Sequence, residues 1–304
     1  MSLKTSCTVD KQLLKAIIGN ITVRLTEEYQ VDGQWIGNEL ASKQLEAAWL
    51  RLSAQDTPMN PRLIGKPGVG KTTLALCTAR RLGLPTYLMQ GTSDTRPDDL
   101  IITPVLNELK QISYVASPLV TAMLVGAVCV LDEGNRMSEK SWASLASLLD
   151  HRRYVDSIIT GVRIYAHPEF RFVTTMNDDA SVYDLPEYIQ SRLCPQIFLE
   201  FSETDVEARI LKNAVPYAQE ELLTLLLHFL SVAHQFDEPY SVRDAIQMAK
   251  YAEKLKSVHS ELNLIQALEM AIHAIVGEEA LKFYVHNARF KQSNNAKSGP
   301  RPVE

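Results

Sequence analysis

One eight-residue segment, residues 65–72, constrains the fold of this chain more than any other feature, because it fits the pattern G-x-x-x-x-G-K-[ST] without a mismatch. Glycines let the backbone curl around an anion with successive amides pointing inward, and a following helix adds its positive dipole end. An apolar run, residues 62–64, precedes the segment, and a helical pattern, residues 72–82, follows it and ends at Gly83. The segment therefore predicts a phosphate-binding loop between a strand and a helix, with a nucleoside triphosphate as its ligand.

Composition predicts a soluble globular protein with a substantial core: the chain has 304 residues, of which 46% are hydrophobic and 22% charged. A net charge of −5 argues against a protein that mainly coats nucleic acid, although a local basic patch is compatible with that sum. The cysteines show no C-x-x-C pairing and no metal-ligand spacing, which favours thiols in a reducing compartment. No stretch is apolar and long enough for a signal peptide or a membrane span, so we expect a cytoplasmic protein.

Apolar runs typical of buried strands alternate with helical patterns from residue 62 to about residue 201, which predicts an α/β fold with a central parallel sheet. The strand candidates are residues 62–64, 86–89, 127–131, 171–175 and 196–201. After that point only helical periodicity remains, and [ST]-x-x-[DE] segments at Ser202 and Ser241 indicate two helix starts. We expect a nucleotide-binding domain over residues 33–201 and a small all-α domain over residues 202–285.

The two ends of the chain lead to different expectations. Leu13, Leu14, Ile17 and Ile18 share a helical face, which predicts an N-terminal helical extension over residues 1–32. A second apolar stripe before the loop predicts another helix, with Leu40, Leu45, Ala48 and Leu50. Residues 286–304 are polar and rich in Asn, Ser, Lys and Pro, so we expect a flexible tail there.

Two carboxylates, Asp132 and Glu133, follow the near-continuous apolar strand of residues 127–131. Ligands bind at the carboxyl ends of strands in open α/β sheets. Asp132 is therefore placed to hold Mg²⁺ together with the Thr72 hydroxyl, and Glu133 to polarise an attacking water. A solvated strand end is the alternative, which the loop about 60 residues upstream disfavours.

Asn177 follows another apolar strand, residues 171–175. An amide beside the two acids can bond both a γ-phosphate and the attacking water. The alternative is a turn-forming asparagine ahead of Asp178 and Asp179.

The order of these motifs resembles that of the AAA+ ATPases, and in particular of their MoxR branch. The motifs are GKPGVGKT, VLDE, FVTTMN, LPEYIQSRL and, in the helical region, Ser241-Val242-Arg243. Residues 97–100, 117–122 and 135–137 are also similar to the MoxR branch, and the resemblance covers about residues 33–255. Three positions depart from it: Ile102 and Ser117 stand where the branch usually has glycine, and Gly134 stands where it usually has an apolar residue.

The resemblance implies a P-loop AAA+ core with a central parallel sheet, followed by a small all-α lid, and it implies ATP and Mg²⁺ as ligands. Lys71 would neutralise the β- and γ-phosphates, Asn177 would act as sensor 1 and Arg243 as sensor 2. The base would rest near Ile36 and Gly37. Because no N-K-x-D segment is present, ATP is favoured over GTP. The loop residues expected to contact the nucleotide are Gly65, Pro67, Gly68, Val69, Gly70, Lys71, Thr72 and Thr73.

Arg192 resembles the arginine finger, which in this family reaches the nucleotide of a neighbouring subunit. A finger supplied in trans implies a ring homo-oligomer, commonly a hexamer. Alternatives stay open: Arg192 can cap the C-terminal end of its own helix, where cations are favoured, and Arg243 can pair with Asp244 or with other acids. The rival fingers are Arg136, Arg152 and Arg153.

Two further segments resemble remodelling surfaces of the family. Residues 101–115 are similar to the helix-2 insertion, and residues 153–157 and 161–165 predict a hairpin with Gly161 in its turn. In related rings such elements face the pore or a partner, although an ordinary exposed hairpin fits the sequence equally well.

Three functions are compatible with these residues. The resemblance implies a chaperone-like ATPase that acts on a protein client, with a von Willebrand factor A domain protein as a partner. We expect no membrane involvement, because no stretch is long enough to span a bilayer. The second is a nucleic-acid-directed AAA+ motor or a restriction or loader subunit, for which Arg152, Arg153, Arg163 and Arg171 leave room. The third is a scaffold that binds ATP without turnover, which Glu133 and Asn177 disfavour.

Overall fold

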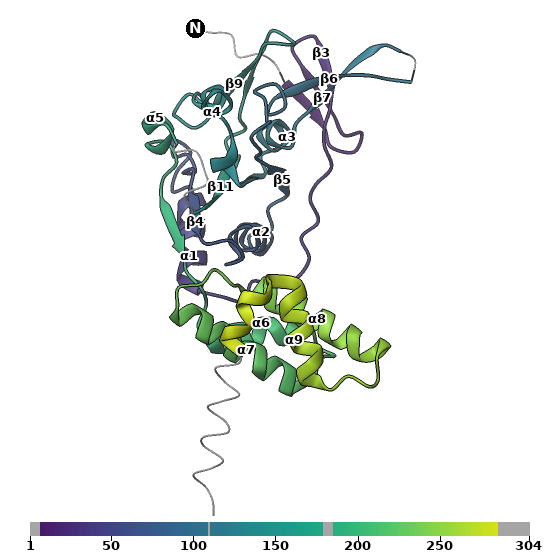
Figure 1. Ribbon diagram of the computed structural model, residues 1–304. Coiled ribbons are helices and arrows are strands. Elements are labelled where there is room, and N and C mark those ends of the chain that lie inside the picture. Colours follow the sequence, from purple (N-terminus) through teal and green to yellow (C-terminus); the bar gives the residue numbers. More distant parts are fainter. Residues whose placement is uncertain (1–6, 109, 179–184, 285–304) are drawn as a thin grey trace, which may run out of the picture. The chain divides into compact units, whose positions relative to one another are not determined.

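The computed structural model describes residues 7–108, 110–178 and 185–284 (Figure 1). Its contacts form two compact units, each with its own hydrophobic core. The first unit runs to Glu200 but excludes Pro67–Val69, and the second contains those three residues and the chain from Phe201 onward. The change from α/β to all-α structure falls between Glu200 and Phe201. In the described ranges no helix is long and apolar enough to cross a bilayer.

A parallel sheet with the strand order β12-β4-β11-β8-β5 forms the centre of the first unit. Its strands match the predicted ones within a few residues: β4 (Arg62–Gly65), β5 (Thr86–Gln90), β8 (Val128–Asp132), β11 (Arg171–Asn177) and β12 (Gln196–Leu199). In register, Asn177 lies opposite Gly65 and Gln90 lies opposite Asp132. The predicted site residues thus end neighbouring strands at one edge of the sheet.

Helices of the first unit lie between successive strands along the chain. They are α1 (Glu39–Trp49), α2 (Lys71–Arg81), α3 (Pro118–Val125), α4 (Glu139–Leu145) and the short α5 (Glu187–Gln190). Ser117, where the MoxR branch usually has glycine, caps α3: its Oγ accepts a hydrogen bond from the Val120 amide and donates one of 2.6 Å to the Leu100 carbonyl. The serine therefore satisfies a helix end that glycine would leave without a side-chain cap.

The predicted helical extension over residues 1–32 is wrong. The chain there forms the antiparallel strands β1 (Cys7–Asp10), β2 (Lys15–Ile18) and β3 (Ile21–Arg24). Burial alternates along β2, where Ala16 and Ile18 are buried and Ile17 is exposed, so the apolar pattern has a period of two. Gly19, with φ +63°, and Asn20 make a two-residue hairpin loop. This Gly-Asn turn signal was overlooked in favour of an apparent helical face.

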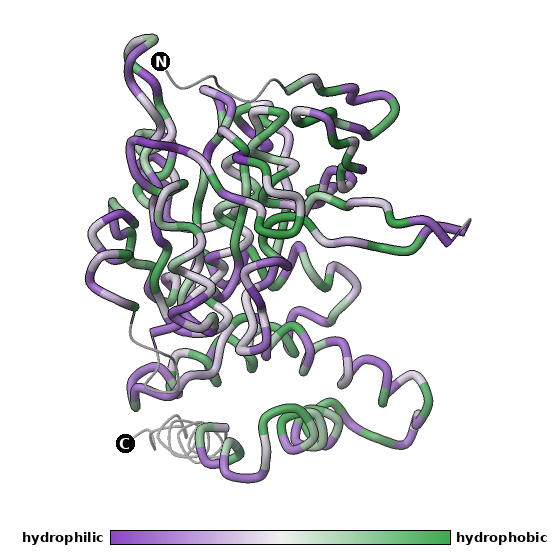
Figure 2. Tube along the Cα trace, turned by 90° about the horizontal axis from the view of Figure 1, so that it is seen from above, coloured by the Kyte–Doolittle hydropathy of each residue, from purple (hydrophilic) through white to green (hydrophobic). Residues whose placement is uncertain are grey.

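These strands form a sheet with the insertion that follows β5. The insertion is a hairpin of β6 (Ile102–Leu106) and β7 (Ile112–Ala116), and β3 pairs with β7 to give a second sheet of order β1-β2-β3-β7-β6. The hairpin extends away from the rest of the first unit in both views (Figures 1 and 2). The other predicted hairpin is confirmed as β9 (Tyr154–Ser157) and β10 (Val162–Tyr165), with Gly161 at φ +66° in its turn.

The second unit is helical, with α6 (Thr204–Ala214), α7 (Glu220–Gln235), α8 (Val242–Val258) and α9 (Leu264–Val276) packed around leucine and alanine side chains. The capping box predicted at Ser241 is confirmed, with Asp244 as its acid. The one predicted at Ser202 is wrong, because Glu203 is the N-cap of α6 and makes no side-chain cap. The predicted tail, residues 286–304, lies outside the described residues.

Candidate nucleotide-binding site

The phosphate-binding loop connects β4 to α2 within residues 65–72. Gly70 precedes α2 in the left-handed conformation, with φ +93°, which glycine adopts without strain. It provides no side-chain cap, so the amides of the first turn of α2 remain available to an anion. Lys71 is buried, and its Nζ donates to the carbonyls of Gly65 (2.7 Å) and Lys66 (2.9 Å). The ammonium group therefore lies within the curve of the loop.

Asp132 brings three elements of the first unit together. Its Oδ1 accepts a 2.5 Å hydrogen bond from the hydroxyl of Thr72 in α2 and a second from the hydroxyl of Thr175 in β11. Carboxylate and hydroxyl oxygens suit Mg²⁺, which usually takes one or two protein ligands and completes its shell with phosphate and water. The described residues contain no cluster of three or more His, Cys, Asp or Glu side chains that could hold a metal by themselves. Thr72 and Asp132 thus fit a magnesium ion that arrives with a nucleotide.

Glu133 has an unusual backbone. Its φ is +54°, in the left-handed region that non-glycine residues seldom occupy, and its amide donates to the Thr175 hydroxyl (2.9 Å). Its Oε2 accepts a 3.1 Å hydrogen bond from Gln90 Nε2 and lies 3.3 Å from Arg136 Nε. The carboxylate is therefore held by two side chains, and Arg136, a rival finger, contacts its own subunit's acid. Gln90 was missed in the sequence, where its one signal was a polar residue at a strand end.

Asn177 ends β11, and a buried second asparagine holds its backbone. Asn135 Nδ2 donates to the Asn177 carbonyl (2.8 Å), and the Asn177 amide donates to Asn135 Oδ1 (3.4 Å). This pairing fixes the strand end that carries the predicted sensor. Asn135 was noted in the sequence only as part of a family-like segment, because its role depends on how two strands lie in register.

Gly134, another departure from the MoxR pattern, has a steric explanation. A Cβ at this position would lie 2.3 Å from Thr174 Oγ1 and 2.8 Å from the Trp142 ring, closer than real side chains approach. The Trp142 indole also donates to the Gly134 carbonyl at 3.0 Å. The local packing of this chain therefore requires glycine directly after Glu133.

Arg192 follows α5 and makes two contacts inside its own subunit. Its Nη1 donates to the Tyr188 carbonyl, and its Nε lies 3.6 Å from Asp150 Oδ2. The contact with Tyr188 is the helix-end interaction that was the alternative to a finger role. Of the other candidates, Arg152 is bound to Asp150, and half-buried Arg153 donates to the Phe170 carbonyl (2.7 Å).

Arg243 is exposed in the first turn of α8 in the second unit. Asp244, its predicted alternative partner, instead accepts hydrogen bonds from the amide and hydroxyl of Ser241, both at 2.8 Å. Both Arg243 and Asp244 are among the described residues, and no ion pair within 4.0 Å joins them. The acid thus serves the helix start and leaves the guanidinium for another role.

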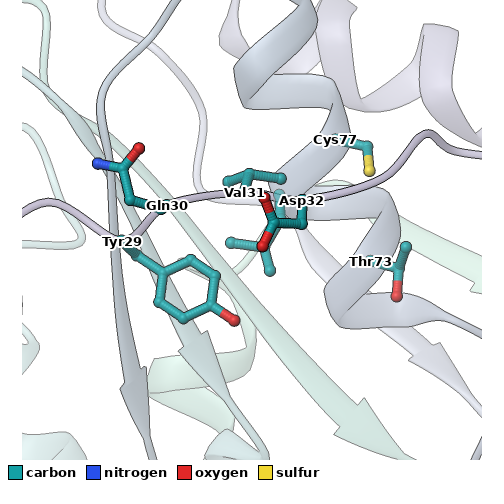
Figure 3. Close-up of a pocket in the computed structure, with 7 residues that line it drawn as sticks. Tyr29, Gln30, Val31, Asp32, Thr73 and Cys77 are labelled. Carbon is teal, nitrogen blue, oxygen red and sulfur yellow. The ribbon is translucent and has the colours of Figure 1, made fainter.

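The segment predicted to meet the base lies beside the loop. The Trp35 ring packs against Gly37, where a Cβ would lie 2.4 Å from it, and against Gly70, where the distance would be 3.0 Å. A hollow of about 200 Å³ opens a few residues earlier in the chain, between an extended segment and α2 (Figure 3). Its lining residues are Tyr29, Gln30, Val31, Asp32, Thr73, Leu76 and Cys77. Ile36 and Gly37 are half-buried and do not line it.

Comparison with known proteins agrees with this geometry. The sequence pattern of an AAA domain of the dynein-related subfamily matches residues 62–193, from the first residue of β4 to the residue after Arg192. Protein CbbQ of Hydrogenophilus thermoluteolus is 28% identical over 180 residues, which are 59% of this chain and 64% of CbbQ. Protein NorQ of Paracoccus denitrificans is 34% identical over 125 residues, 41% of this chain and 45% of NorQ. Residues 62–193 of the chain therefore match an AAA domain, and the chain is similar to CbbQ and NorQ. It spans less than two thirds of the length of either relative.

Solved structures show the same fold. The P216G mutant of RuvB from Thermotoga maritima superposes with a TM-score of 0.54 at 19% identity, over 79% of this chain and 71% of that one. The Thermotoga maritima RuvB Holliday junction branch migration motor gives 0.51 at 18% identity, over 79% and 70%. The predicted fold class, a parallel AAA+ sheet followed by a helical region, is confirmed.

Proposed function

We propose that this AAA+ protein hydrolyses ATP to ADP and phosphate and uses the cycle to remodel a protein client. One observation carries the proposal: the Thr72 hydroxyl and the Asp132 carboxylate meet at 2.5 Å, at the sheet edge where Glu133 and Asn177 also lie. These residues are the acidic, hydroxyl and amide groups that phosphoryl transfer to water requires. The match of residues 62–193 to an AAA domain and the similarity to CbbQ and NorQ support the same reaction.

Each residue would have a separate part in the reaction. Lys71 would exchange its contacts with the Gly65 and Lys66 carbonyls for β- and γ-phosphate oxygens. Thr72 and Asp132 would hold Mg²⁺, which neutralises phosphate charge when bound. Glu133, held by Gln90 and Arg136, would accept a hydrogen bond from the attacking water and orient that water toward the γ-phosphate.

Binding of the adenine base is part of the proposal. Ile36 and Gly37 keep the predicted role in contacting the base, beside the Trp35 ring that covers Gly70. The hollow along α2 adds Thr73 and an apolar wall from Leu76 and Cys77 (Figure 3). Backbone and apolar contacts of this kind accept adenine without a dedicated guanine-reading segment.

A protein client fits the two hairpins better than a nucleic acid does. Exposed aliphatic side chains occupy the β6–β7 hairpin, where Leu106 is 74% and Ile112 66% exposed, and the β9–β10 turn, where Ile158 is 86% exposed. Contiguous exposed apolar surface marks sites of protein–protein interaction, and these side chains would form such a surface for a client. We include a von Willebrand factor A domain partner and a cytoplasmic location in the proposal, on the resemblance to the MoxR branch.

The nucleic-acid alternative depended on four arginines, and each has a partner within the first unit. Asp150 binds Arg152, Asp156 binds Arg163, Glu169 binds Arg171, and Arg153 donates to a backbone carbonyl. Paired guanidiniums offer less positive charge to a phosphate backbone. Binding to DNA that weakens steeply with salt would nevertheless restore this alternative, so a salt titration with single- and double-stranded DNA tests it.

Ring assembly with Arg192 acting in trans is tested by mixing two inactive variants. Arg192→Ala subunits keep a complete nucleotide site but lack the finger, and Lys71→Ala subunits have a defective site but an intact finger. Each variant alone is expected to lose at least about a hundredfold in ATPase rate, because an arginine finger contributes on the order of a thousandfold or more. Their mixture should regain activity, with the ring confirmed by sedimentation. A mixture that stays inactive although it assembles would show that Arg192 is no trans finger.

A further inference from the structure

Asp150 lies between two arginines of the first unit, and both are candidate fingers. Arg152 donates from Nε to Oδ1 (3.0 Å) and Oδ2 (3.1 Å) and from Nη2 to Oδ2 (2.7 Å). Arg192 Nε lies 3.6 Å from the same Oδ2. The Asp150 side chain is only 14% exposed, so both guanidiniums share one largely enclosed carboxylate.

The two arginines are held differently. Arg152 takes the hydrogen bonds, and these hold the pKa of Asp150 at about 2, so the carboxylate is ionised throughout the physiological range. At 3.6 Å the Arg192 contact is an ion pair without a hydrogen bond, and Arg192 Nε is buried without a hydrogen-bond partner among the described residues. Arg192 Nε is thus held toward Asp150 by charge attraction, without a hydrogen bond.

The backbones that carry Asp150 and Arg192 are tied together by Asn60. Its Nδ2 donates to the carbonyl of Leu149 (2.9 Å) and to that of Arg192 (3.4 Å). Asn60 directly precedes Pro61 and β4, the strand that leads into the phosphate-binding loop. The separation between Asp150 and Arg192 is therefore set from the central sheet.

We propose that Asp150 is a positioning residue for Arg192, which fixes the direction in which the guanidinium reaches the nucleotide of the neighbouring subunit. This inference rests on the proposed function of Arg192 as a finger. Asp150 attracts the Nε side of the guanidinium while the Tyr188 carbonyl accepts from Nη1, and together these contacts restrict rotation of the group. Without the carboxylate, Arg152 and Arg192 are neighbouring like charges that repel each other.

The test is Asp150→Asn, which keeps the shape of the side chain and removes its charge. The ATPase kcat is expected to fall by about tenfold to a hundredfold, the scale of a misplaced catalytic group, while the Kd for ATP changes less than about twofold. Mixing this variant with Lys71→Ala subunits, whose Asp150 and Arg192 are intact, should restore activity. A structural role within its own nucleotide site could not be rescued in this way.

Two matched variants separate Asp150 from the rest of the surface. Arg152→Gln keeps the carboxylate for Arg192 and should retain kcat within about fivefold, because the contact between Asp150 and Arg192 does not depend on the charge of Arg152. Asp156→Asn removes the other aspartate–arginine pair, with Arg163 on the β9–β10 hairpin, and should leave kcat unchanged. In the Arg192→Ala background, Asp150→Asn should have no further effect, because it acts through Arg192.

The outcomes are distinguishable. If Arg192→Ala is rescued by Lys71→Ala subunits but Asp150→Asn is not, the finger stands and the role of Asp150 is overturned. A loss of ATP affinity in Asp150→Asn, or a loss of kcat in Arg152→Gln as large as that in Asp150→Asn, overturns it as well. If neither mixture regains activity, the trans finger itself fails, and the inference fails with it.

Discussion

The hydroxyl of Thr72 donates a 2.5 Å hydrogen bond to Oδ1 of Asp132 and so joins the first turn of α2 to the end of β8. The pair brings a hydroxyl and a carboxylate oxygen to one point beside the phosphate-binding loop. Thr175 donates to the same oxygen from β11, so the carboxylate has a fixed orientation before any ligand binds. A preoriented carboxylate of this kind needs little rearrangement to accept a metal ion.

We expect Asp132→Asn to weaken binding of Mg²⁺-ATP by about tenfold to a hundredfold, because a hydrogen bond or contact with a charged group contributes about 1.5–3 kcal/mol. Binding of ATP in the presence of a chelator should change little. Titration of a fluorescent ATP analogue with and without Mg²⁺ measures both affinities. Thr72→Val, which keeps the branched shape and removes the hydroxyl, should give a smaller loss in the same direction. Equal losses in both conditions would argue against a metal role for the pair.

Glu133→Gln should keep ATP binding and lower hydrolysis by at least about a hundredfold, since a general base contributes about 10²–10⁴ to the rate. The amide can still interact with Gln90 but can no longer accept a proton from water. Phosphate release under saturating ATP measures the effect. Glu139→Gln, an exposed acid in the first turn of α4, is the matched control and should leave the rate unchanged. Turnover retained in Glu133→Gln would remove this residue from its role and favour a scaffold that binds ATP without using it.

Asn135→Ala should lower kcat by about tenfold without changing the Kd for ATP, because it releases the strand end that carries Asn177. The variant should also lower the free energy of unfolding by about 1–3 kcal/mol, the cost of leaving a buried hydrogen-bonding group without its partner. Asn135→Asp is informative beside it, since it keeps the acceptor for the Asn177 amide and removes the donor to the Asn177 carbonyl. An unchanged kcat in the alanine variant would mean that Asn177 is held by other contacts.

Motif residues could be located from the sequence because the chemistry of phosphate binding fixes both their type and their place after apolar strands. Thr72, Asp132 and Asn177 lie at one sheet edge for the reason that the apolar runs indicated, namely that parallel strands end together. Gln90 had only the signal of a polar residue at a strand end, and Asn60 and Asp150 could not be found in that way. Their contacts depend on the register of neighbouring strands and on side-chain direction, and neither leaves a pattern in a single sequence.

The N-terminal strands show a different limit. Residues 15–18 contain three apolar side chains in a row, so periods of 2 and 3.6 fit almost equally well over so short a stretch. Residues 15–18 pair with β3, and β3 in turn pairs with β7, a strand about 90 residues later; only Gly19-Asn20 gave a local sign of this sheet. Long-range pairing therefore decided a structure that local periodicity left ambiguous.

Gly134→Ala should lower the free energy of unfolding of the first unit by about 1–3 kcal/mol, the cost of overpacking a core, because its Cβ would overlap Thr174 and Trp142. Denaturation in guanidinium followed by tryptophan fluorescence reports this unit, which contains Trp35, Trp49 and Trp142. Gly161 also has a positive φ, +66°, but a Cβ there would have no atom within 4 Å. Gly161→Ala should therefore lower the free energy of unfolding only by the cost of the left-handed backbone, about 1 kcal/mol. Equal losses in the two variants would contradict the steric explanation of Gly134.

Glu207 in α6 should make the stability of the second unit depend on pH. The side chain is buried, its Oε1 has no hydrogen-bond partner among the described residues, and His234 Nδ1 lies 4.0 Å away. Burial raises the pKa of the Glu207 carboxyl from 4.5 to about 7. The folded unit therefore binds more protons than the unfolded chain between about pH 4.5 and pH 7, and its stability falls as the pH rises through that range.

Glu207→Gln, which carries no charge at any pH, should remove most of this dependence. At pH 8 the variant is expected to be more stable than the wild type by up to roughly 3 kcal/mol, from about 1.4 kcal/mol for each unit of pKa difference, and at pH 4.5 the two should be similar. Amide hydrogen exchange in α6 and α7, corrected for the intrinsic exchange rate at each pH, measures the local stability. Glu203→Gln, an exposed acid at the start of α6, is the control and should keep the wild-type pH dependence. If Glu207→Gln instead weakens protection at pH 8, the ionised carboxylate is stabilised by its contacts in the fold, and the direction of the pH effect is reversed.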